Sequence, residues 1–563
     1  MRAGESGNAE IHRELESRAA FPRDAGAGDA TSGSGSGSGS DKVEIVETHL
    51  SRLYFVGARV FKVKKAVDLG FVDFTTLEQR KFACDEEVRL NRRLAPNTYL
   101  GVRPIVRAPA GGVRVGGAGA PVEYAVEMVR LPAAQMLDAK LARGEIDRAC
   151  VDRIVARLAD FHEHAERGPE IARFAAPEAV ARNVLENLAG SRAAAQRFDA
   201  ECDATVPSLS PRLAHFLEGA FARFTADERP RFEQRIADRR ICEGHGDLHT
   251  GNLCILEDEV VAFDCIEFSR ALRCLDVAAD LAFLLMDLDR LGFRAFGRDL
   301  ALRYSQRTRD PTLLALVPFY KAHLACVRGK VAALRGAGSA DAPVRARSRS
   351  EAIGFFSQSA SYALPPLLLA TSGLPGSGKS FVARALAPRL DAVHLQSDFE
   401  RKRLAGVAPT EPTAPEARAQ VYSEEMTRRT YAQLFDEARR DLERGRRVVL
   451  DATFPTAALR ARAADLAHEL GVPFVLLACA ADDLQTRRRL AARAHERNEF
   501  SDADAAVYDQ AKRRYEPPTE IAPERRVDVA GDANGDDVLV ALLDRVIAQL
   551  EGAGRLPATF PLG

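Results

Sequence analysis

The fold of the C-terminal part of the chain is decided by the sequence GLPGSGKS, which occupies residues 373–380. It fits the pattern GxxxxGK[ST] of a phosphate-binding loop, or P-loop, and it lies between a predicted strand, 367–371, and a predicted helix, 379–390. In such a loop, glycines allow backbone N–H groups to turn inward around phosphate, and the helix N-terminus adds its positive end. The residues predicted to bind nucleotide are Gly373, Gly376, Ser377, Gly378, Lys379 and Ser380.

The last two residues of the motif predict the nucleotide and its metal. We expect Lys379 to reach the β- and γ-phosphates of ATP and the Ser380 hydroxyl to hold Mg²⁺. Asp451 ends an apolar strand predicted at 447–450 and is a second, Walker-B-like holder of Mg²⁺ or of water. A Gly-rich turn without function would explain the glycines alone, but not their position between a strand and a helix.

Further residues favour phosphoryl transfer to an acceptor over simple hydrolysis of ATP. Asp398 follows a second predicted strand, 393–396, at the sheet edge where an acceptor hydroxyl would lie, and it is a candidate base for that hydroxyl's proton. Arg401 is a candidate to orient acceptor or phosphate. Arg489 and Arg493 share one face of a predicted helix and are candidates to close over ATP. The ordinary alternatives are a helix N-cap for Asp398 and a solvated helix face for the arginines.

Residues 365–520 resemble a P-loop kinase family that includes zeta-type toxins, polynucleotide 5′-kinases and gluconate-kinase-like enzymes. The segments that carry the resemblance are GLPGSGKS, SDFERKRL (397–404), VVLDATF (448–454), RRRLAAR (487–493) and SDAD (501–504). The resemblance implies transfer of the γ-phosphate of ATP to a hydroxyl of a small molecule or a nucleic acid, and it does not name the acceptor. Strand–helix alternation through this region predicts an α/β P-loop NTPase domain with a parallel sheet.

A second phosphotransfer motif lies in the N-terminal part, in HGDLHTGN at residues 245–252. It contains HxDxxxxN, and Asp264 follows at the end of a short strand predicted at 260–263. In kinase chemistry a loop Asp accepts the substrate proton, an Asn five residues on binds Mg²⁺, and a second Asp binds the same metal cluster. We expect Asp247, Asn252 and Asp264 to have these roles. A polar loop followed by a hairpin is the ordinary alternative.

The lysine that would bind ATP in this part is sought in the strand predicted at 59–64. Lys62 is chosen over Lys64 and Lys65 because apolar residues flank it. Its expected partner is Glu87 on the following helix, with Glu86 as second choice. A charged strand edge is the ordinary explanation of these lysines. A small β-rich lobe followed by a larger helical lobe predicts a bilobal α+β domain of the protein-kinase type.

Residues 45–335 resemble the aminoglycoside phosphotransferase and choline-kinase-like family in HGDLHTGN and in VVAFDCIEF (260–268). The resemblance implies a kinase-like domain that uses ATP and Mg²⁺. No GxGxxG loop precedes Lys62, so clamping of phosphate must come from the turn at 48–51 or be weak. The acceptor-binding helices are not readable, so an aminoglycoside is not implied. The two domains in this order resemble the bacterial proteins called bifunctional aminoglycoside phosphotransferase/ATP-binding proteins.

Length and composition set the remaining expectations. The chain has 563 residues and a formal net charge of −1, so bulk charge gives no case for nucleic acid or an anionic membrane. It shows no apolar run of membrane-spanning length, no signal-peptide core and no CxxC among its nine cysteines, so we expect a cytoplasmic protein without disulfides. The predicted division is a disordered Gly/Ser-rich tail (1–40), a kinase-like domain (41–345), a linker with a short helix (346–364), a P-loop domain (365–553) and a loose tail (554–563).

The sequence therefore predicts two ATP–Mg²⁺ sites on unrelated folds, each transferring a γ-phosphoryl group to a hydroxyl of a small-molecule acceptor. Two alternatives stay open. The P-loop domain alone could be catalytic, with the first domain a nucleotide-sensing pseudokinase, or the chain could be a regulatory or toxin-type module that acts on a macromolecule. The complete set of Asp247, Asn252 and Asp264 argues against an inactive first domain, and the near-neutral charge argues weakly against nucleic acid. Neither the acceptors nor the oligomeric state can be read from the sequence.

Overall fold

The computed structural model describes residues 3–22, 43–68, 70, 72–109, 111–257, 259–408, 411, 413–493, 505–555 and 560. The chain forms two compact units. Unit 1 comprises Met1–Ala179 and Pro230–Val317, and unit 2 comprises Val180–Arg229 and Pro318–Gly563. Each unit is therefore assembled from two separate stretches of sequence, and the P-loop lies in unit 2.

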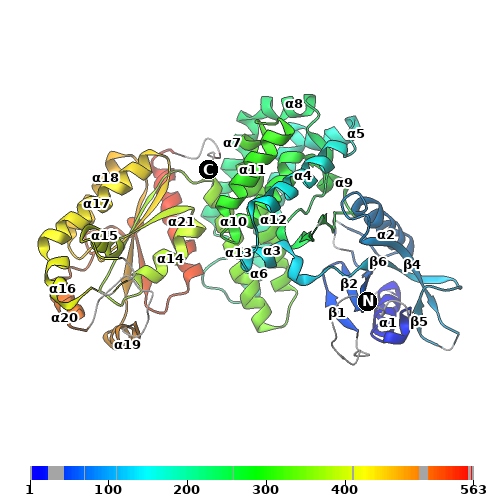
Figure 1. Ribbon diagram of the computed structural model, residues 1–563, viewed down its shortest axis with the longest axis horizontal. Helices are drawn as coiled ribbons and strands as arrows, with labels where there is room; N and C mark the ends of the chain where they lie inside the picture. Colours follow the sequence, from blue (N-terminus) through cyan, green and yellow to red (C-terminus); the bar gives the residue numbers. More distant parts are fainter. Residues whose placement is uncertain are drawn as a thin grey trace. The chain divides into compact units, whose positions relative to one another are not determined.

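Unit 1 contains an antiparallel sheet of six strands in the order β1-β2-β3-β6-β4-β5 (Figure 1). The strands are β1 (Glu44–Glu47), β2 (Ser51–Val56), β3 (Arg59–Lys64), β4 (Tyr99–Arg107), β5 (Val113–Val115) and β6 (Pro121–Val129). Strands β2 and β3 form a hairpin, and Gly57 in its turn has φ 59°, which glycine adopts without strain. Side chains alternate across a strand, so Lys62 and Lys64 lie on the same face of β3.

Helix α2 (Leu77–Asn91) packs on this sheet, over β4 and β6. It begins after Thr76, whose side chain accepts a hydrogen bond from the N–H of Gln79 while the Gln79 side chain accepts one from the N–H of Thr76. The helix buries Cys84, Glu87 and Val88. A buried glutamate needs a cation, and the lysines of β3 supply it.

The rest of unit 1 is mainly helical and contains two short antiparallel strand pairs, β7 with β10 and β8 with β9. The loops at the ends of the β8–β9 hairpin carry Asn252 and Asp264. The remaining elements are α1 (Ala3–Glu14), α3 (Leu137–Ala142), α4 (Arg148–His164), α5 (Pro169–Ala172), α8 (Arg229–Ala237), β7 (Ile241–Glu243), β8 (Leu253–Ile255), β9 (Val260–Ala262), α9 (Arg270–Arg273), β10 (Cys274–Asp276), α10 (Val277–Arg290) and α11 (Arg294–Thr308).

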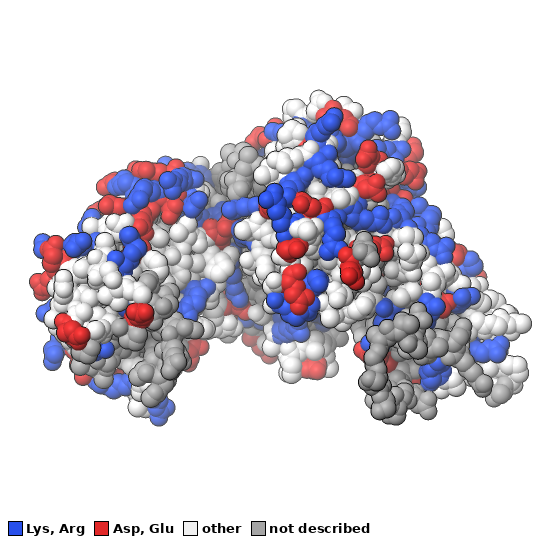
Figure 2. Space-filling view, viewed as in Figure 1, with Lys and Arg blue, Asp and Glu red and all other residues white. Residues whose placement is uncertain are grey.

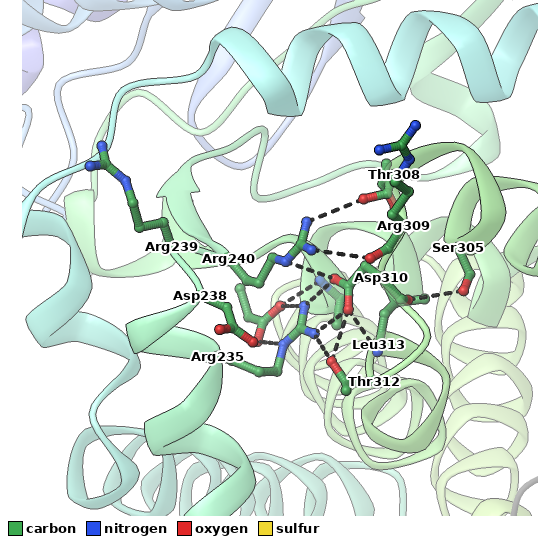
Figure 3. A network of polar contacts seen from close by, with 12 residues as sticks. Arg235, Asp238, Arg239, Arg240, Ser305, Thr308, Arg309, Asp310, Thr312 and Leu313 are labelled. Atoms are coloured by element: carbon green, nitrogen blue, oxygen red, sulfur yellow. Dashed lines mark hydrogen bonds and ion pairs between the residues drawn. The ribbon is translucent and has the colours of Figure 1, made fainter.

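A buried network of charges fixes the beginning of α10 (Figure 3). Arg235 is fully buried, and its guanidinium donates to both carboxylate oxygens of Asp276 and, at 2.9 and 3.0 Å, to those of Asp310. Asp276 is the N-cap of α10 and accepts a hydrogen bond of 2.8 Å from the N–H of Ala278. The first turn of α10 carries Asp280, so this network positions the residue that holds the HGDLHTGN loop.

Unit 2 contains a five-stranded parallel sheet in the order β12-β13-β11-β14-β15. The strands are β11 (Leu368–Ser372), β12 (Ala392–Gln396), β13 (Arg447–Asp451), β14 (Phe474–Ala480) and β15 (Arg526–Ala530). All residues of β11 and β13 are buried, as expected for strands covered on both faces. The predicted parallel sheet of the C-terminal domain is confirmed.

Helices cover both faces of this sheet (Figure 1). Helices α17 and α18 pack on one face against β12, β13 and β14, and α14 and α21 pack on the other. The helices of the P-loop domain are α14 (Lys379–Arg389), α15 (Ser397–Leu404), α16 (Pro415–Val421), α17 (Glu424–Glu443), α18 (Ala457–Glu469), α19 (Asp483–Arg493), α20 (Ala505–Arg514) and α21 (Gly535–Gly552). None of the described helices combines the length and apolar character needed to cross a bilayer.

Four further helices belong to unit 2, namely α6 (Pro177–Glu201), α7 (Pro211–Asp227), α12 (Leu313–Ala337) and α13 (Ala342–Ala363). Helices α7 and α13 pack on α21. The helix predicted within the linker at 346–364 is present, but it is longer than predicted, since α13 has 22 residues and ends at Ala363. The segment is not a linker, because it buries Phe355, Phe356 and Tyr362 within unit 2. The Ala-, Ser- and Arg-rich start of this segment suggested a soft connection, but the aromatic residues that follow give the helix a face to bury.

The predicted disordered tail at 1–40 is also wrong for its first half. Helix α1 packs beside the sheet of unit 1, with Ile11 and Leu15 buried in one apolar cluster with Tyr54 and Phe61. Polar contacts hold it too, since Nδ2 of Asn8 lies 2.7 Å from a carboxylate oxygen of Glu123. The Gly/Ser repeat itself lies outside the described residues.

The predicted loose C-terminal tail is wrong at one position. Phe560 is only 4% exposed and packs within unit 2 against Phe221, Phe224 and Phe319, with ring centroids 5.2–5.7 Å apart. The tail is short and rich in Gly and Pro, so its sequence shows no helical or strand periodicity that would mark Phe560 as buried. All nine cysteines are free, and all but Cys202 are buried, as expected for small apolar residues.

Candidate active sites

The P-loop joins β11 to α14, and three of its glycines, Gly373, Gly376 and Gly378, have positive φ. Gly373 has φ 147°, and a Cβ there would lie 2.2 Å from the carbonyl oxygen of Cys479. Gly376 has φ 79°, and a Cβ there would lie 2.9 Å from Cγ2 of Thr486. Any other residue would have to displace the neighbouring strand end or α19. The glycines therefore allow the loop to turn its backbone inward, as a phosphate cradle requires.

Two side chains of the P-loop fit an anionic ligand. Ser377 is 4% exposed, and its Oγ has no hydrogen-bond partner within the described residues. Lys379 is 8% exposed, and its Nζ donates to the carbonyl oxygen of Leu374 at 2.7 Å. A buried hydroxyl without a hydrogen-bond partner is costly. A phosphate group at this loop would supply acceptors to both side chains, so these residues fit a nucleotide.

Ser380 and Asp451 meet at the carboxyl edge of the sheet. The Ser380 hydroxyl donates to Oδ1 of Asp451 at 3.1 Å, and Oδ2 lies 3.1 Å from Nε2 of His394 and 3.4 Å from Nε2 of Gln396. Burial alone would raise the pKa of Asp451, but the contacts with His394 and the charge of Lys379 lower it. The pair therefore offers a hydroxyl and an ionised carboxylate, the oxygen ligands that Mg²⁺ takes.

Sequence reasoning missed His394 and Gln396. Both lie on β12, and the register places Gln396 directly beside Asp451 on β13. Residues two apart on a strand face the same side. The signal for them in the sequence is a pair of polar side chains at alternate positions of the strand predicted at 393–396.

Asp398 and Arg401 lie one turn apart on α15. Asp398 is half-buried in the first turn, where a carboxylate is favoured by the helix dipole. Arg401 is 8% exposed; its Nη1 donates to the carbonyl oxygen of Val421 at 3.3 Å and to Thr427 at 3.0 Å, and its guanidinium stacks on Tyr422. Its Nε is buried without a partner among the described residues. The guanidinium of Arg401 is therefore fixed in place, and its Nε can still donate a hydrogen bond to a bound ligand.

Arg489 lies beside the P-loop. Its Nη2 donates to the carbonyl oxygen of Gly531 at 2.6 Å, and a Cβ added to Gly378 would lie 3.5 Å from its Nη1. The guanidinium is therefore close enough to the loop to reach a bound phosphate. The side chain of Arg493 and the SDAD segment at 501–504 lie outside the described residues.

In unit 1, helix α10 holds the start of the HGDLHTGN loop. Oδ2 of Asp280 accepts the N–H of His245 at 2.7 Å, and Oδ1 accepts the N–H of Gly246 at 2.9 Å. Nε2 of His162 contacts the same carboxylate at 3.1 Å. Nε2 of His245 lies 2.9 Å from the carbonyl oxygen of Phe263, and burial lowers the pKa of His245. A neutral His245 therefore ties the loop to the strand that precedes Asp264.

The structure brings Asp247, Asn252 and Asp264 to one place. Nδ2 of Asn252 donates to the carbonyl oxygen of Asp247 at 3.0 Å and lies 3.4 Å from its Oδ2. The N–H of Phe263 donates to the carbonyl oxygen of Asn252 at 3.1 Å, which places Asp264 next to it. Asp264 has φ 65°, and its N–H donates to the Tyr99 hydroxyl at 3.1 Å. Such left-handed backbone at a non-glycine residue is often found at functional sites.

Lys62 and Lys64 share the carboxylate of Glu87. Nζ of Lys62 lies 2.8 Å from Oε1 of Glu87 and 2.5 Å from Oδ1 of Asp264. Nζ of Lys64 lies 2.5 Å from Oε2 of Glu87 and also contacts Glu267. Burial alone would lower the pKa of Lys62, but Asp264 and Glu87 raise it. Burial alone would raise the pKa of Asp264, but Lys62 lowers it, so both groups are charged.

Lys65 and Glu86 lie outside this cluster. Lys65 pairs with Glu47 at 2.6 Å, and Glu86 pairs with Arg89 at 2.8 Å. Of the three candidate lysines, Lys62 is the one that touches Asp264. Sequence reasoning missed Glu267, although its distance of three residues from a candidate metal ligand could have drawn attention to it.

His162 and His249 have structural roles. His162 is buried and bonded to Tyr304 at 2.7 Å, and the His249 side chain caps the short turn Thr250–Asn252. No three His, Cys, Asp or Glu side chains of the described residues are arranged to hold a metal ion on their own. A Mg²⁺ ion at either site would complete its coordination with water and with phosphate oxygens of the nucleotide, as is usual for Mg²⁺ in kinases.

A family model described as an AAA domain matches residues 368–518. The uncharacterized proteins Rv2004c and MT2060 of Mycobacterium tuberculosis and Mb2027c of Mycobacterium bovis are each 32% identical to this chain over 473 residues. The alignments cover 84% of this chain and 90% of each relative. The chain belongs to the family of these mycobacterial proteins. Because the match covers so much of the chain, it includes parts of both units, so the pairing of the two is a property of this family.

Similar solved structures include Kti12 of Chaetomium thermophilum in complex with ADP-AlF3, at 20% identity and a TM-score of 0.26 over 32% of this chain and 98% of that chain. The APS kinase CysC of Mycobacterium tuberculosis, in complex with AMPPNP and APS, is 23% identical with a TM-score of 0.24 over 32% of this chain and 97% of that chain. The family model and the geometry of residues 373–380 together show that the C-terminal part of the chain is a P-loop domain.

Proposed function

We propose that the chain is an ATP- and Mg²⁺-dependent phosphotransferase with two kinase-type sites, one in each unit. The P-loop site is supported most directly by the hydrogen bond between Ser380 and Asp451 beside the buried Lys379. A hydroxyl and a carboxylate would hold Mg²⁺, and the metal would supply charge neutralisation at the phosphates. Lys379 would carry a positive charge to the phosphoryl group that moves.

The acceptor of the P-loop site would lie between α15 and the P-loop. Asp398 would take the proton of the acceptor hydroxyl, and Arg401 would orient the acceptor or the phosphate. Arg489 would stabilise charge from the opposite side, because its guanidinium lies beside Gly378. A small hydroxylated molecule is the proposed acceptor. On the face shown in Figure 2, acidic and basic side chains are interspersed rather than gathered in one field of the kind that attracts nucleic acid.

The site in unit 1 is supported by the contacts of Lys62 with Glu87 and Asp264. Lys62 would bind the α- and β-phosphates, Asn252 and Asp264 would hold Mg²⁺, and Asp247 would accept the proton of a second hydroxyl acceptor. This arrangement is the kinase-type set that the resemblance to aminoglycoside phosphotransferases implies. The proposal is for a kinase-like domain and not for an aminoglycoside substrate.

One observation favours weak nucleotide binding in unit 1. Strands β1 and β2 are joined by a tight turn in which Ser51 N–H donates to Oγ1 of Thr48 at 3.0 Å, and Thr48 N–H donates to the Ser51 carbonyl oxygen at 2.9 Å. These groups are used within the turn, so it offers few donors to clamp phosphate. A nucleotide-sensing role for unit 1 therefore remains the second candidate.

The experiment that tests both sites is binding and turnover in single-site variants of the full chain. Lys379→Ala should remove transfer at the P-loop site, and Asp247→Asn should remove transfer in unit 1 while ATP binding there persists, because the base acts on the acceptor. Labelled ATP and a metabolite extract identify the products of each site. Loss of both products in one of these variants would contradict two independent sites.

A further inference from the structure

Lys64 and Glu267 form a buried ion pair that the phosphotransfer roles above do not use. The Lys64 side chain is 1% exposed and that of Glu267 is 5% exposed. Lys64 also pairs with Glu87, which is fully buried. Complete burial of a lysine between two carboxylates is expensive unless the geometry is well satisfied. Lys64 lies between Glu87 and Glu267, and this position indicates the role of the pair.

The pair closes a ring of charges around the candidate metal ligand. Lys62 joins Glu87 to Asp264, and Lys64 joins Glu87 to Glu267. Asp264 and Glu267 are three residues apart in the chain, which completes the ring. The ring links β3, α2 and the segment after β9, so the metal-binding segment is tied to the helix that carries the glutamate partner of the ATP lysine.

Each residue of the segment 264–267 is held by a different contact. The N–H of Cys265 donates to Oδ1 of Asn91 at 2.9 Å, and the N–H of Ile266 donates to the carbonyl oxygen of His245 at 3.0 Å. The side chain of Glu267 is held by its ion pair with Lys64. The carboxylate of Asp264, by contrast, is 43% exposed and touches Lys62.

The two lysines therefore have different tasks. Lys62 touches the carboxylate that a metal would need, so this contact must be given up or shared when Mg²⁺ and nucleotide bind. Lys64 touches no candidate ligand, and its two contacts can persist through that exchange. We propose that Lys64 and Glu267 are positioning residues that keep the Asp264 segment registered against Glu87 while Lys62 moves to the nucleotide. This inference rests on the proposed function of unit 1.

The test measures nucleotide affinity rather than turnover, with the full chain carrying Lys379→Ala so that the P-loop site is weakened. The probe is AMP-PNP, titrated by calorimetry once in excess Mg²⁺ and once in EDTA. The variants are Glu267→Gln, which keeps the shape of the side chain, and the double variant Lys64→Met/Glu267→Met, which leaves no unpaired buried charge. Lys65→Met is the matched control, because Lys65 lies next in the chain and pairs with Glu47 outside the ring.

Loss of a residue that orients a metal ligand typically weakens metal binding about 10–100-fold. We expect both variants to bind the probe about tenfold or more weakly in Mg²⁺ but within about twofold of the parent in EDTA, and Lys65→Met to match the parent in both. Equal losses in Mg²⁺ and EDTA, together with a lower thermal midpoint, would show a purely structural pair and overturn the proposal. Unchanged affinity in Mg²⁺ would overturn it too. Absence of Mg²⁺-dependent binding in the parent would instead refute the nucleotide site of unit 1, and this inference with it.

Discussion

Replacement of Arg235 by leucine should destabilise unit 1 through the two carboxylates left behind. Arg235 donates to Asp276 and Asp310, and all three side chains are at least 98% buried (Figure 3). Removal of one partner from a buried ion pair costs about 3–5 kcal/mol. Asp310 keeps hydrogen bonds from Thr312 and Leu313, and Asp276 keeps its cap on α10. We therefore expect the lower end, about 3 kcal/mol, or about 6–12 °C in thermal midpoint.

The assay is calorimetric unfolding of the full chain, in which the transition of unit 1 should shift. Burial alone would raise the pKa of Asp310, but Arg235 lowers it, so in the intact protein this carboxylate stabilises the fold above its unfolded pKa and loses that effect as pH falls through the folded pKa. Without Arg235 the burial of Asp310 should raise the pKa of this carboxylate, which then becomes neutral more easily. The difference in stability between the intact protein and Arg235→Leu should then become smaller as the pH falls from about 7 to about 5.

The matched control is Arg239→Leu. Arg239 lies four residues further on, is exposed, and points away from the network in Figure 3. A surface substitution of this kind changes the free energy of unfolding by no more than about 0.5 kcal/mol. A shift in Arg235→Leu no larger than that of Arg239→Leu, or a gap that does not depend on pH, would refute the reasoning.

Three other changes have expected outcomes. Lys379→Ala should lower turnover at the P-loop site about 10²–10³-fold in a labelled-ATP assay, because a charge aimed at the transferred phosphoryl is lost, and unchanged turnover would remove Lys379 from the site. Asp264→Ala should abolish the Mg²⁺-dependent part of nucleotide binding in unit 1, measured by calorimetry in Mg²⁺ and in EDTA. If unit 1 of the unaltered chain binds nucleotide equally well in Mg²⁺ and in EDTA, this expectation is contradicted. Phe560→Ala should destabilise unit 2 by about 3–5 kcal/mol in urea unfolding, whereas Phe381→Ala, with a side chain 70% exposed, should be nearly neutral.

The local motifs could be read from sequence because their chemistry fixes both spacing and context. GLPGSGKS needs a strand before it and a helix after it, and both are present. The turn at Gly57 is similarly local, since a hairpin turn depends on neighbours a few residues away. Asp451 could be predicted for the same reason, because it directly follows the apolar residues of β13.

Long-range partners could not be read in this way. Glu267 meets Lys64 from 203 positions away, and Phe560 meets Phe221 from the far end of unit 2. An isolated buried aromatic residue in a short Gly- and Pro-rich segment gives no periodic signal, and neither does a carboxylate whose cation lies on a distant strand. The first helix was missed because the Gly/Ser repeat after it dominates the composition of the first 40 residues.

The number of nucleotides bound by one chain tests the central claim most directly. Calorimetry of the full chain with AMP-PNP and Mg²⁺ should show two sites of different affinity. Asp264→Ala should leave only the P-loop site, and Lys379→Ala should leave mainly the site of unit 1. A single site that Lys379→Ala weakens and Asp264→Ala leaves unchanged would contradict the account, because unit 1 would then bind no nucleotide.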